Sequence, residues 1–157
     1  MASSAISGMG VKFWRWHATS VVGWVAISEI SAIDGPSKTR ETIEVTALDS
    51  AGGYREYIPS LREGGSVSLT MNFTHANYDT LNADFESDTP QNYLISIPDA
   101  SHTMLEFEGL VTELPIAISV GDKISSNVTI KVTGKVYIFG GVSEVPASAS
   151  SPTDIET

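Results

Sequence analysis

The stretch ISSNVTIKVTGKVYI, residues 124–138, is the part of the sequence that decides the fold class. Its even-numbered positions are mostly apolar, as at Val128, Ile130 and Val132, and its odd-numbered positions are polar or charged, as at Lys131. An alternation with a period of two is typical of a β-strand that buries one face and exposes the other to solvent. The end of the chain therefore predicts one long, half-buried strand.

The same alternation recurs earlier in the chain. Val67, Leu69, Met71 and Phe73 alternate with serine, threonine and asparagine, which predicts a second strand. In residues 42–47 a shorter run alternates in the same way, with Ile43, Val45 and Ala47 on one face and Glu44 on the other. Residues 24–33 and 93–97 are rich in β-forming residues but less regular. We expect all of these segments to be strands.

Residues 104–114 form a further predicted strand with acidic residues at alternate positions. Leu105, Phe107 and Val111 are expected to share the buried face, whereas Glu106 and Glu108 are expected on the solvent face. Two neighbouring carboxylates can perform acid–base chemistry, but only in a pocket that separates their pKa values. On a solvent-exposed strand face, solvated carboxylates are the expected interpretation.

One segment has a helical rather than a strand period. In residues 76–86, Tyr78, Leu81 and Phe85 recur on one helical face, and Asn77 is the predicted N-cap. Turn sequences separate the strands, for example Asp34-Gly35-Pro36-Ser37. The sequence therefore predicts a mainly β protein, an antiparallel β-sandwich or partial barrel of about six or seven strands with one flanking α-helix.

The charge of the chain is strongly acidic and unevenly distributed. The 157 residues hold 19 acidic and 9 basic residues, a formal net charge of −10. Residues 41–113 hold thirteen acids against Arg55 and Arg62, whereas residues 1–40 and 114–140 each carry a net +2. A chain of this charge should repel nucleic acid.

Cysteine is absent, which excludes disulfides and thiol chemistry.

The two ends differ in composition from the middle. Residues 1–19 are predicted to be a flexible N-terminal arm, residues 20–140 the folded domain, and the Ser/Pro-rich residues 141–157 a disordered tail.

No Gly-rich phosphate loop or G-x-S-x-G elbow occurs, and the histidines lack the spacing of a metal pair. We therefore expect no catalytic residues, no cofactor and no metal.

Four ordered segments resemble a known family. They read WVAISEISAIDGPS (24–37), RETIEVTALDS (40–50), GGYREYIPSL (52–61) and EGGSVSL (63–69), and the closing strand reads TIKVTGKV (129–136). This series resembles the major tail tube proteins of long, non-contractile-tailed bacteriophages, the lambda-type family. Ser60 stands where that family usually has glycine, and an additional immunoglobulin-like domain found in some members is not expected.

The resemblance implies a structural virion protein whose subunits form hexameric rings stacked into a tube, through which DNA passes at ejection without specific binding. It implies as partners the tape measure protein and tail tip or terminator proteins, and location in the virion tail after assembly in the host cytoplasm. Membrane binding is not implied. The ring-stacking loop would be residues 48–59. Its candidate residues are Leu48, Asp49, Ser50, Gly52, Gly53, Tyr54, Arg55 and Glu56.

The resemblance also suggests roles for the acidic strands and for the N-terminal arm. Glu44, Glu106 and Glu108 are candidate lumen-facing acids because each lies opposite the apolar face of its predicted strand. The arm would become ordered on assembly. Its candidate contact residues are Phe13, Trp14, Arg15 and Trp16.

Two other interpretations of the sequence remain open. A monomeric β-sandwich that binds carbohydrate or a receptor could use exposed aromatic residues such as Trp14, Trp16 and Tyr54. The related tube protein of type six secretion systems has the same expected architecture. A hydrolase is a weaker alternative, because no nucleophile–base pair can be named.

Overall fold

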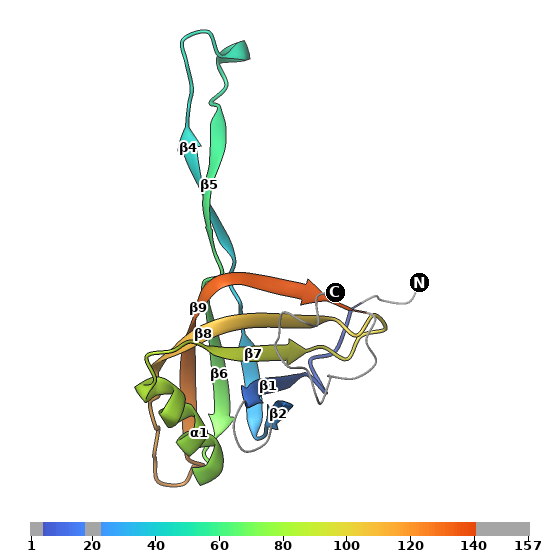
Figure 1. Ribbon diagram of the computed structural model, residues 1–157, viewed down its shortest axis with the longest axis vertical. Helices are drawn as coiled ribbons and strands as arrows, with labels where there is room; N and C mark the ends of the chain where they lie inside the picture. The colour runs from blue at the N-terminus through green and yellow to red at the C-terminus, as the bar shows by residue number, and fades with distance from the viewer. Residues whose placement is uncertain (1–4, 18–22, 141–157) are drawn as a thin grey trace.

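The computed structural model describes residues 5–17 and 23–140. Within these ranges the chain forms nine strands, one α-helix and one short 3₁₀ turn (Figure 1). In chain order the elements are β1 (Lys12–His17), β2 (Gly23–Ile27), β3 (Ile30–Asp34), β4 (Thr39–Glu44), η1 (Ala51–Gly53), β5 (Tyr57–Glu63), β6 (Ser66–Asn72), α1 (His75–Glu86), β7 (Gln91–Ser96), β8 (Met104–Glu113) and β9 (Ser125–Phe139). The predicted mainly β class with a single helix is confirmed.

Seven of the strands form one antiparallel sheet in the order β2-β1-β7-β8-β9-β6-β3. The sheet does not close into a barrel, because β2 and β3 are its two edges. These edge strands are nevertheless consecutive in the chain, joined through Ser28 and Glu29. Such a short link between opposite edges requires the sheet to curl until the edges approach one another. The result is a strongly curved, open sheet.

Strand β9 connects the two halves of this sheet. Its first half pairs with β6, from Ser125 to Lys131, and its second half pairs with β8 as far as Phe139. The predicted alternation holds along most of the strand, since Val128, Ile130, Val132 and Val136 are all buried. It ends at Ile138, which is 60% exposed.

The core lies on both faces of the central strands. The larger cluster contains Phe13, Tyr93 and Phe107, whose ring centroids lie 5.5 to 6.4 Å apart. On the opposite face, Trp16 and Trp24 pack edge to face at 5.4 Å, against Leu94 and Met104. Because successive strand residues point to opposite faces, β1 and β7 contribute to both clusters.

This packing corrects the predicted N-terminal arm. Residues 12–17 are not a free segment but strand β1, which pairs with β2 on one side and β7 on the other. Phe13 and Trp16 are buried at 1% and 8% exposure, so they are core residues rather than arm contacts. Residues 1–4, residues 18–19 and the predicted tail 141–157 lie outside the described residues.

Helix α1 forms where its period predicts it, with one local difference. Its N-cap is Thr74 rather than Asn77, because the Thr74 side chain accepts a hydrogen bond from the backbone N–H of Asn77 at 3.4 Å. Leu81 is fully buried against the sheet, but Phe85 is 45% exposed. Among the described residues, no helix has the length and apolarity that crossing a membrane would require.

Strands β4 and β5 form a separate two-stranded sheet that projects from the body as a long arm (Figure 1). We call residues 38–63 the β4–β5 arm. The predicted strand around Ile43 is present, but its apolar face is not buried, because all six residues of β4 are exposed. The alternation is present, but no part of the described chain covers its apolar face.

Candidate assembly surface

The tip of the β4–β5 arm is held in a defined conformation by its own hydrogen bonds. The backbone N–H of Val45 donates to the Glu56 carbonyl at 2.8 Å, and that of Glu56 donates to the Thr46 hydroxyl at 2.9 Å. The Ser50 hydroxyl donates to the Glu56 carboxylate at 2.8 Å and accepts from the Ala47 N–H at 3.0 Å. The predicted stacking loop therefore presents an ordered surface rather than a loose loop.

Large apolar side chains are exposed along this arm in unusual number. Leu48 and Tyr54 at the tip are 110% and 77% exposed, and Leu61 near the root is 75% exposed. The arm also exposes Ile43, Val45, Tyr57 and Ile58. Single exposed apolar residues are ordinary, but a contiguous group of them marks an interaction surface.

A second group of exposed apolar residues lies in the segment between β8 and β9, residues 114–124. Ile118 and Val120 are 73% and 107% exposed, and Ile116 and Ile124 are about two-fifths exposed. This segment lies beside α1, at the end of the molecule opposite the arm (Figure 1). The subunit therefore carries two different apolar surfaces at opposite ends.

Two of the three predicted lumen acids are brought together. Glu44 lies on the arm, whereas Glu106 and Glu108 lie in β8 and line one small cavity. Glu108 is exposed as predicted, but Glu106 is buried at 4% exposure, so its expected position on a solvent face is wrong. The alternation itself holds, because Leu105, Phe107 and Val111 all pack in the larger cluster. Glu106 is buried on the opposite face because that face carries the second cluster, to which its neighbours Leu94 and Met104 belong.

The aromatic residues proposed for carbohydrate binding are also separated. Trp16 is buried in the core, and Trp14 is half-buried with its indole N–H donating to the Ser96 hydroxyl at 3.1 Å. Tyr54 ends the short turn η1 between β4 and β5, on the arm. These three side chains form no common binding face.

Sequence reasoning missed a buried cluster around Asp84. Its carboxylate accepts hydrogen bonds from Arg15 Nε at 2.7 Å and from the Tyr93 hydroxyl at 2.8 Å, and Arg15 Nη2 contacts it as well. Burial by itself lowers the pKa of Arg15, but the hydrogen bond and charge of Asp84 outweigh burial and raise it. Burial raises the pKa of Tyr93, and the charge of Asp84 raises it further. The cluster ties α1 to β1 and β7, so its role is structural.

This fold, a curled antiparallel sheet with one helix and a projecting hairpin, is shared by chains in solved structures of tail and tube assemblies. The chain belongs to the lambda phage tail tube protein family, since the family profile described as "Lambda phage tail tube protein, TTP" matches residues 14–139. It is accordingly a tail tube protein, a structural component of the virion tail and not an enzyme. The family resemblance of the sequence is confirmed.

Solved structures of low sequence identity share the fold. A chain from the tail of an empty gene transfer agent particle, determined with C6 symmetry, is 21% identical, with a TM-score of 0.72 over 87% of this chain and 100% of that one. A chain of the PVC sheath–tube complex, an extracellular contractile injection system, is 13% identical, with a TM-score of 0.65 over 87% and 93%. The SPP1 tail tube protein is 11% identical, with a TM-score of 0.66 over 98% and 86%. A search of curated proteins by sequence gives no match.

Proposed function

We propose that this chain assembles into hexameric rings that stack into a hollow tail tube, and that DNA passes through the tube during ejection. The observation that carries this proposal is the pair of exposed apolar surfaces at opposite ends of the subunit, the β4–β5 arm and residues 114–124. Two different complementary surfaces on one subunit make a head-to-tail contact, which repeats without limit along an axis. The C6 symmetry of the similar gene transfer agent tail supports six subunits per ring.

The lumen of this tube would be acidic. Glu108 is the candidate that best fits a lumen position, because it is an exposed carboxylate on the broad sheet. An acidic wall repels the phosphate backbone, so that DNA moves past without binding. The family also implies a tape measure protein and tip or terminator proteins as partners, with assembly in the host cytoplasm.

Electron microscopy of the purified protein at increasing concentration tests this proposal. We expect tubes of uniform diameter above a critical concentration, with sixfold symmetry in end views. A protein that stays monomeric at every concentration, alone and with its tip proteins, would contradict it.

The arm tip gives a second test. Deletion of residues 52–56 should abolish stacking because it removes the exposed surface that contains Tyr54. The monomer should keep its unfolding free energy within about 0.5 kcal/mol, since the tip contributes no buried residue to the core. Tubes of normal length from the deletion variant would show that the tip is not the stacking surface.

A further inference from the structure

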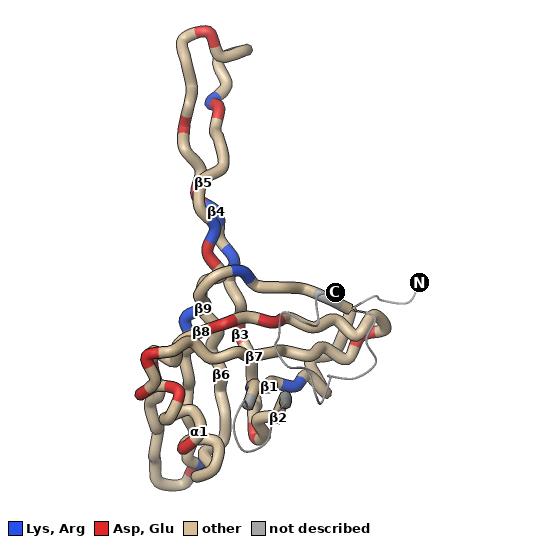
Figure 2. Tube along the Cα trace, viewed as in Figure 1, with Lys and Arg blue, Asp and Glu red and all other residues tan. Residues whose placement is uncertain are grey.

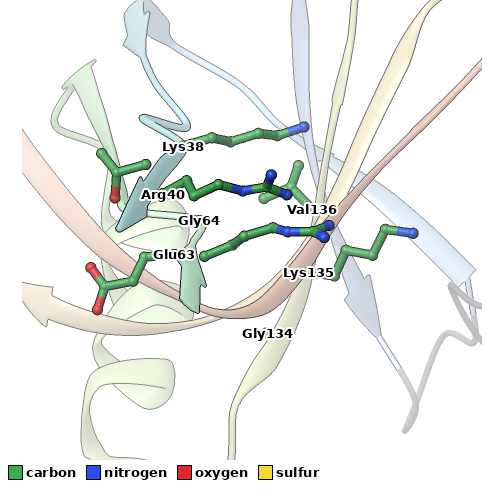
Figure 3. Close-up of a pocket in the computed structure, with 9 residues that line it drawn as sticks. Lys38, Arg40, Glu63, Gly64, Gly134, Lys135 and Val136 are labelled. Carbon is green, nitrogen blue, oxygen red and sulfur yellow. The ribbon is translucent and has the colours of Figure 1, made fainter. Parts of the chain in front are cut away.

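A cleft with basic walls lies at the root of the β4–β5 arm, where the arm meets β9. It has a volume of about 480 Å³ and a floor that includes Gly64, Gly134 and Val136. Its walls carry the cations Lys38, Arg40, Arg62 and Lys135. Figure 3 shows Lys38, Arg40 and Lys135 extending toward the same side, whereas Glu63 points the other way. We call these residues the root cleft.

Three of the four cations of the root cleft are not neutralised by the subunit itself. Arg40 and Arg62 are directly opposite one another in the β4–β5 register, an arrangement of like charges that destabilises a sheet. Glu63, the acidic residue of the cleft, lies 4.0 Å from Lys131 instead. Among the described residues, none of the four cations forms an ion pair of 4.0 Å or less. Lys135 nevertheless has neighbours within the chain, since its ammonium lies 4.9 Å from the Tyr137 ring centroid and it lines a second cavity with Glu106 and Glu108. Lys38, Arg40 and Arg62 are therefore the exposed cations that face a partner.

The distal half of the same arm has the opposite charge. Residues 41–58 hold four acids against Arg55, a net charge of −3. Figure 2 shows the basic residues at the root of the arm and mainly acidic residues toward its tip. Asp49 is exposed and has no hydrogen bond or ion pair within the described chain. The tip also exposes Leu48 and Tyr54, which suit the apolar floor of the cleft.

We propose that the root cleft binds the acidic arm tip of a second copy of this chain in the next ring. This inference rests on the proposed stacking and names the surface that receives the arm. Complementary charges at the two ends of one arm favour this contact over a tip–tip or root–root contact, because both of those bring like charges together.

The length of the arm is compatible with this contact. From Lys38 to Ala47 the chain advances about nine residues, or about 30 Å at about 3.3 Å per residue, before it turns back between Ala47 and Ser50. A compact body of about 100 residues has a radius of gyration of about 13 Å, which corresponds to a sphere about 34 Å across. A copy displaced along the arm by about one body length therefore has its root cleft at the level of the first copy's tip.

Cysteine cross-linking tests the contact directly, because the natural chain has no cysteine. We would combine Ala51→Cys at the tip with Thr39→Cys, which lines the cleft, since neither substitution changes a charge. The arm turns back between Ala47 and Ser50, so the two positions are separated by about eight residues of extended chain, or about 25 Å. This is far beyond the roughly 7 Å limit for a disulfide within one chain. Oxidation of assembled tubes should give a ladder of dimers, trimers and higher species on a non-reducing gel.

The matched control combines Ala51→Cys with Ala100→Cys, an exposed position in the β7–β8 turn outside the cleft. It should give no ladder. Tubes that form normally but yield no ladder from the Ala51→Cys/Thr39→Cys variant would overturn the inference and leave the proposed tube intact. A wild-type protein that forms no tubes would instead contradict the proposed function itself.

Charge reversal supplies an independent test. The root variant Arg40→Glu/Arg62→Glu keeps a like-charge pair across the strands, so monomer stability should change little. We expect it, and the tip variant Glu44→Lys/Asp49→Lys, each to raise the critical concentration about tenfold or more. Combining all four substitutions again gives the root cleft and the arm tip charges of opposite sign. This variant should return the critical concentration to within about threefold of wild type.

The control for net charge is Lys12→Glu/Ala100→Glu/Ser101→Glu, which makes the same change in net charge at exposed positions outside the cleft. It should assemble within about threefold of the wild-type critical concentration. Normal assembly of the root variant, or a combined variant no better than either parent, would overturn the pairing of root cleft and tip.

Discussion

Asp84 is the residue at which helix α1 and strands β1 and β7 meet. Its side chain is 2% exposed, and it compensates the positive charge of Arg15, whose side chain is 14% exposed. Removing one member of such a pair leaves the other charge buried without compensation, which is far more costly than the net value of the pair. The helix is therefore held in place by one carboxylate as well as by Leu81.

Asp84→Asn tests this role. We expect the unfolding free energy to fall by about 3 kcal/mol, because the amide keeps the shape but loses the charge that balances Arg15. Urea unfolding followed by tryptophan fluorescence measures the change. Asp79→Asn, an exposed position on the same helix, is the control and should stay within about 0.5 kcal/mol of wild type. A loss below about 1 kcal/mol for Asp84→Asn would contradict the argument.

The hydrogen bonds of Asp99 predict how the stability of the fold depends on pH. Hydrogen bonds from the Thr103 hydroxyl and backbone N–H lower the pKa of its carboxyl. Because the pKa is lower in the folded chain, the stabilisation is complete above the ordinary aspartate pKa of about 4 and is lost as the pH falls through the folded value. Wild type should therefore lose more stability than Asp99→Asn between about pH 5 and pH 2. Urea unfolding at a series of pH values measures this. An identical dependence of the unfolding free energy on pH in the two proteins would refute it.

At the scale of elements, the β4–β5 arm is positioned by close backbone contacts at its root. Gly65 has φ +74°, and a Cβ there would lie 2.2 Å from the Ser37 carbonyl oxygen. The chain entering the arm and the chain leaving it thus cross at a separation that excludes a side chain. A rigid root lets a long exposed hairpin keep one direction relative to the body.

Gly65→Ala should reveal this constraint. The left-handed φ alone costs alanine about 1–2 kcal/mol, and the backbone clash should bring the total loss to about 3 kcal/mol or more. Gly53→Ala is a matched control, since Gly53 also has φ +74° but no atom within 4 Å of its added Cβ. Thermal unfolding of both variants separates the clash from the φ penalty. Equal losses would mean that the close crossing at the root is unimportant.

At the scale of the whole molecule, the subunit has two ends with different surfaces. The arm and residues 114–124 both expose apolar side chains, and they lie at opposite ends of the body (Figure 1). Burying these surfaces between copies would supply a driving force that the monomer lacks. The acidic net charge then limits unspecific association outside these contacts.

Ile118→Asp/Val120→Asp tests the second end. Both side chains are largely exposed, so monomer stability should stay within about 0.5 kcal/mol of wild type. The critical concentration for tube formation should rise about tenfold or more, because assembly would bury two unpaired carboxylates. Pelleting assays measure it. Met9→Asp, a substitution at an 85% exposed position outside both ends, should assemble normally, and normal assembly of the Ile118/Val120 variant would exclude this end as an interface.

The sequence by itself determined where regular structure forms. Alternation predicts β6 and β9, and a helical period predicts α1, because these signals arise from neighbours a few residues apart. The family was also readable from the order of short segments between Trp24 and Val136.

Tertiary structure decided which of these faces are covered. Residues 12–17 become a strand inside the sheet by pairing with β7, about 80 residues further along the chain, and no local sequence pattern indicates such a partner. The apolar residues of β4 alternate like those of β6, yet they stay exposed because the arm leaves the body. Glu106 is buried because the sheet face that it shares with Met104 carries a second apolar cluster. Periodicity records which side chains share a face, whereas burial depends on what the rest of the chain places against that face.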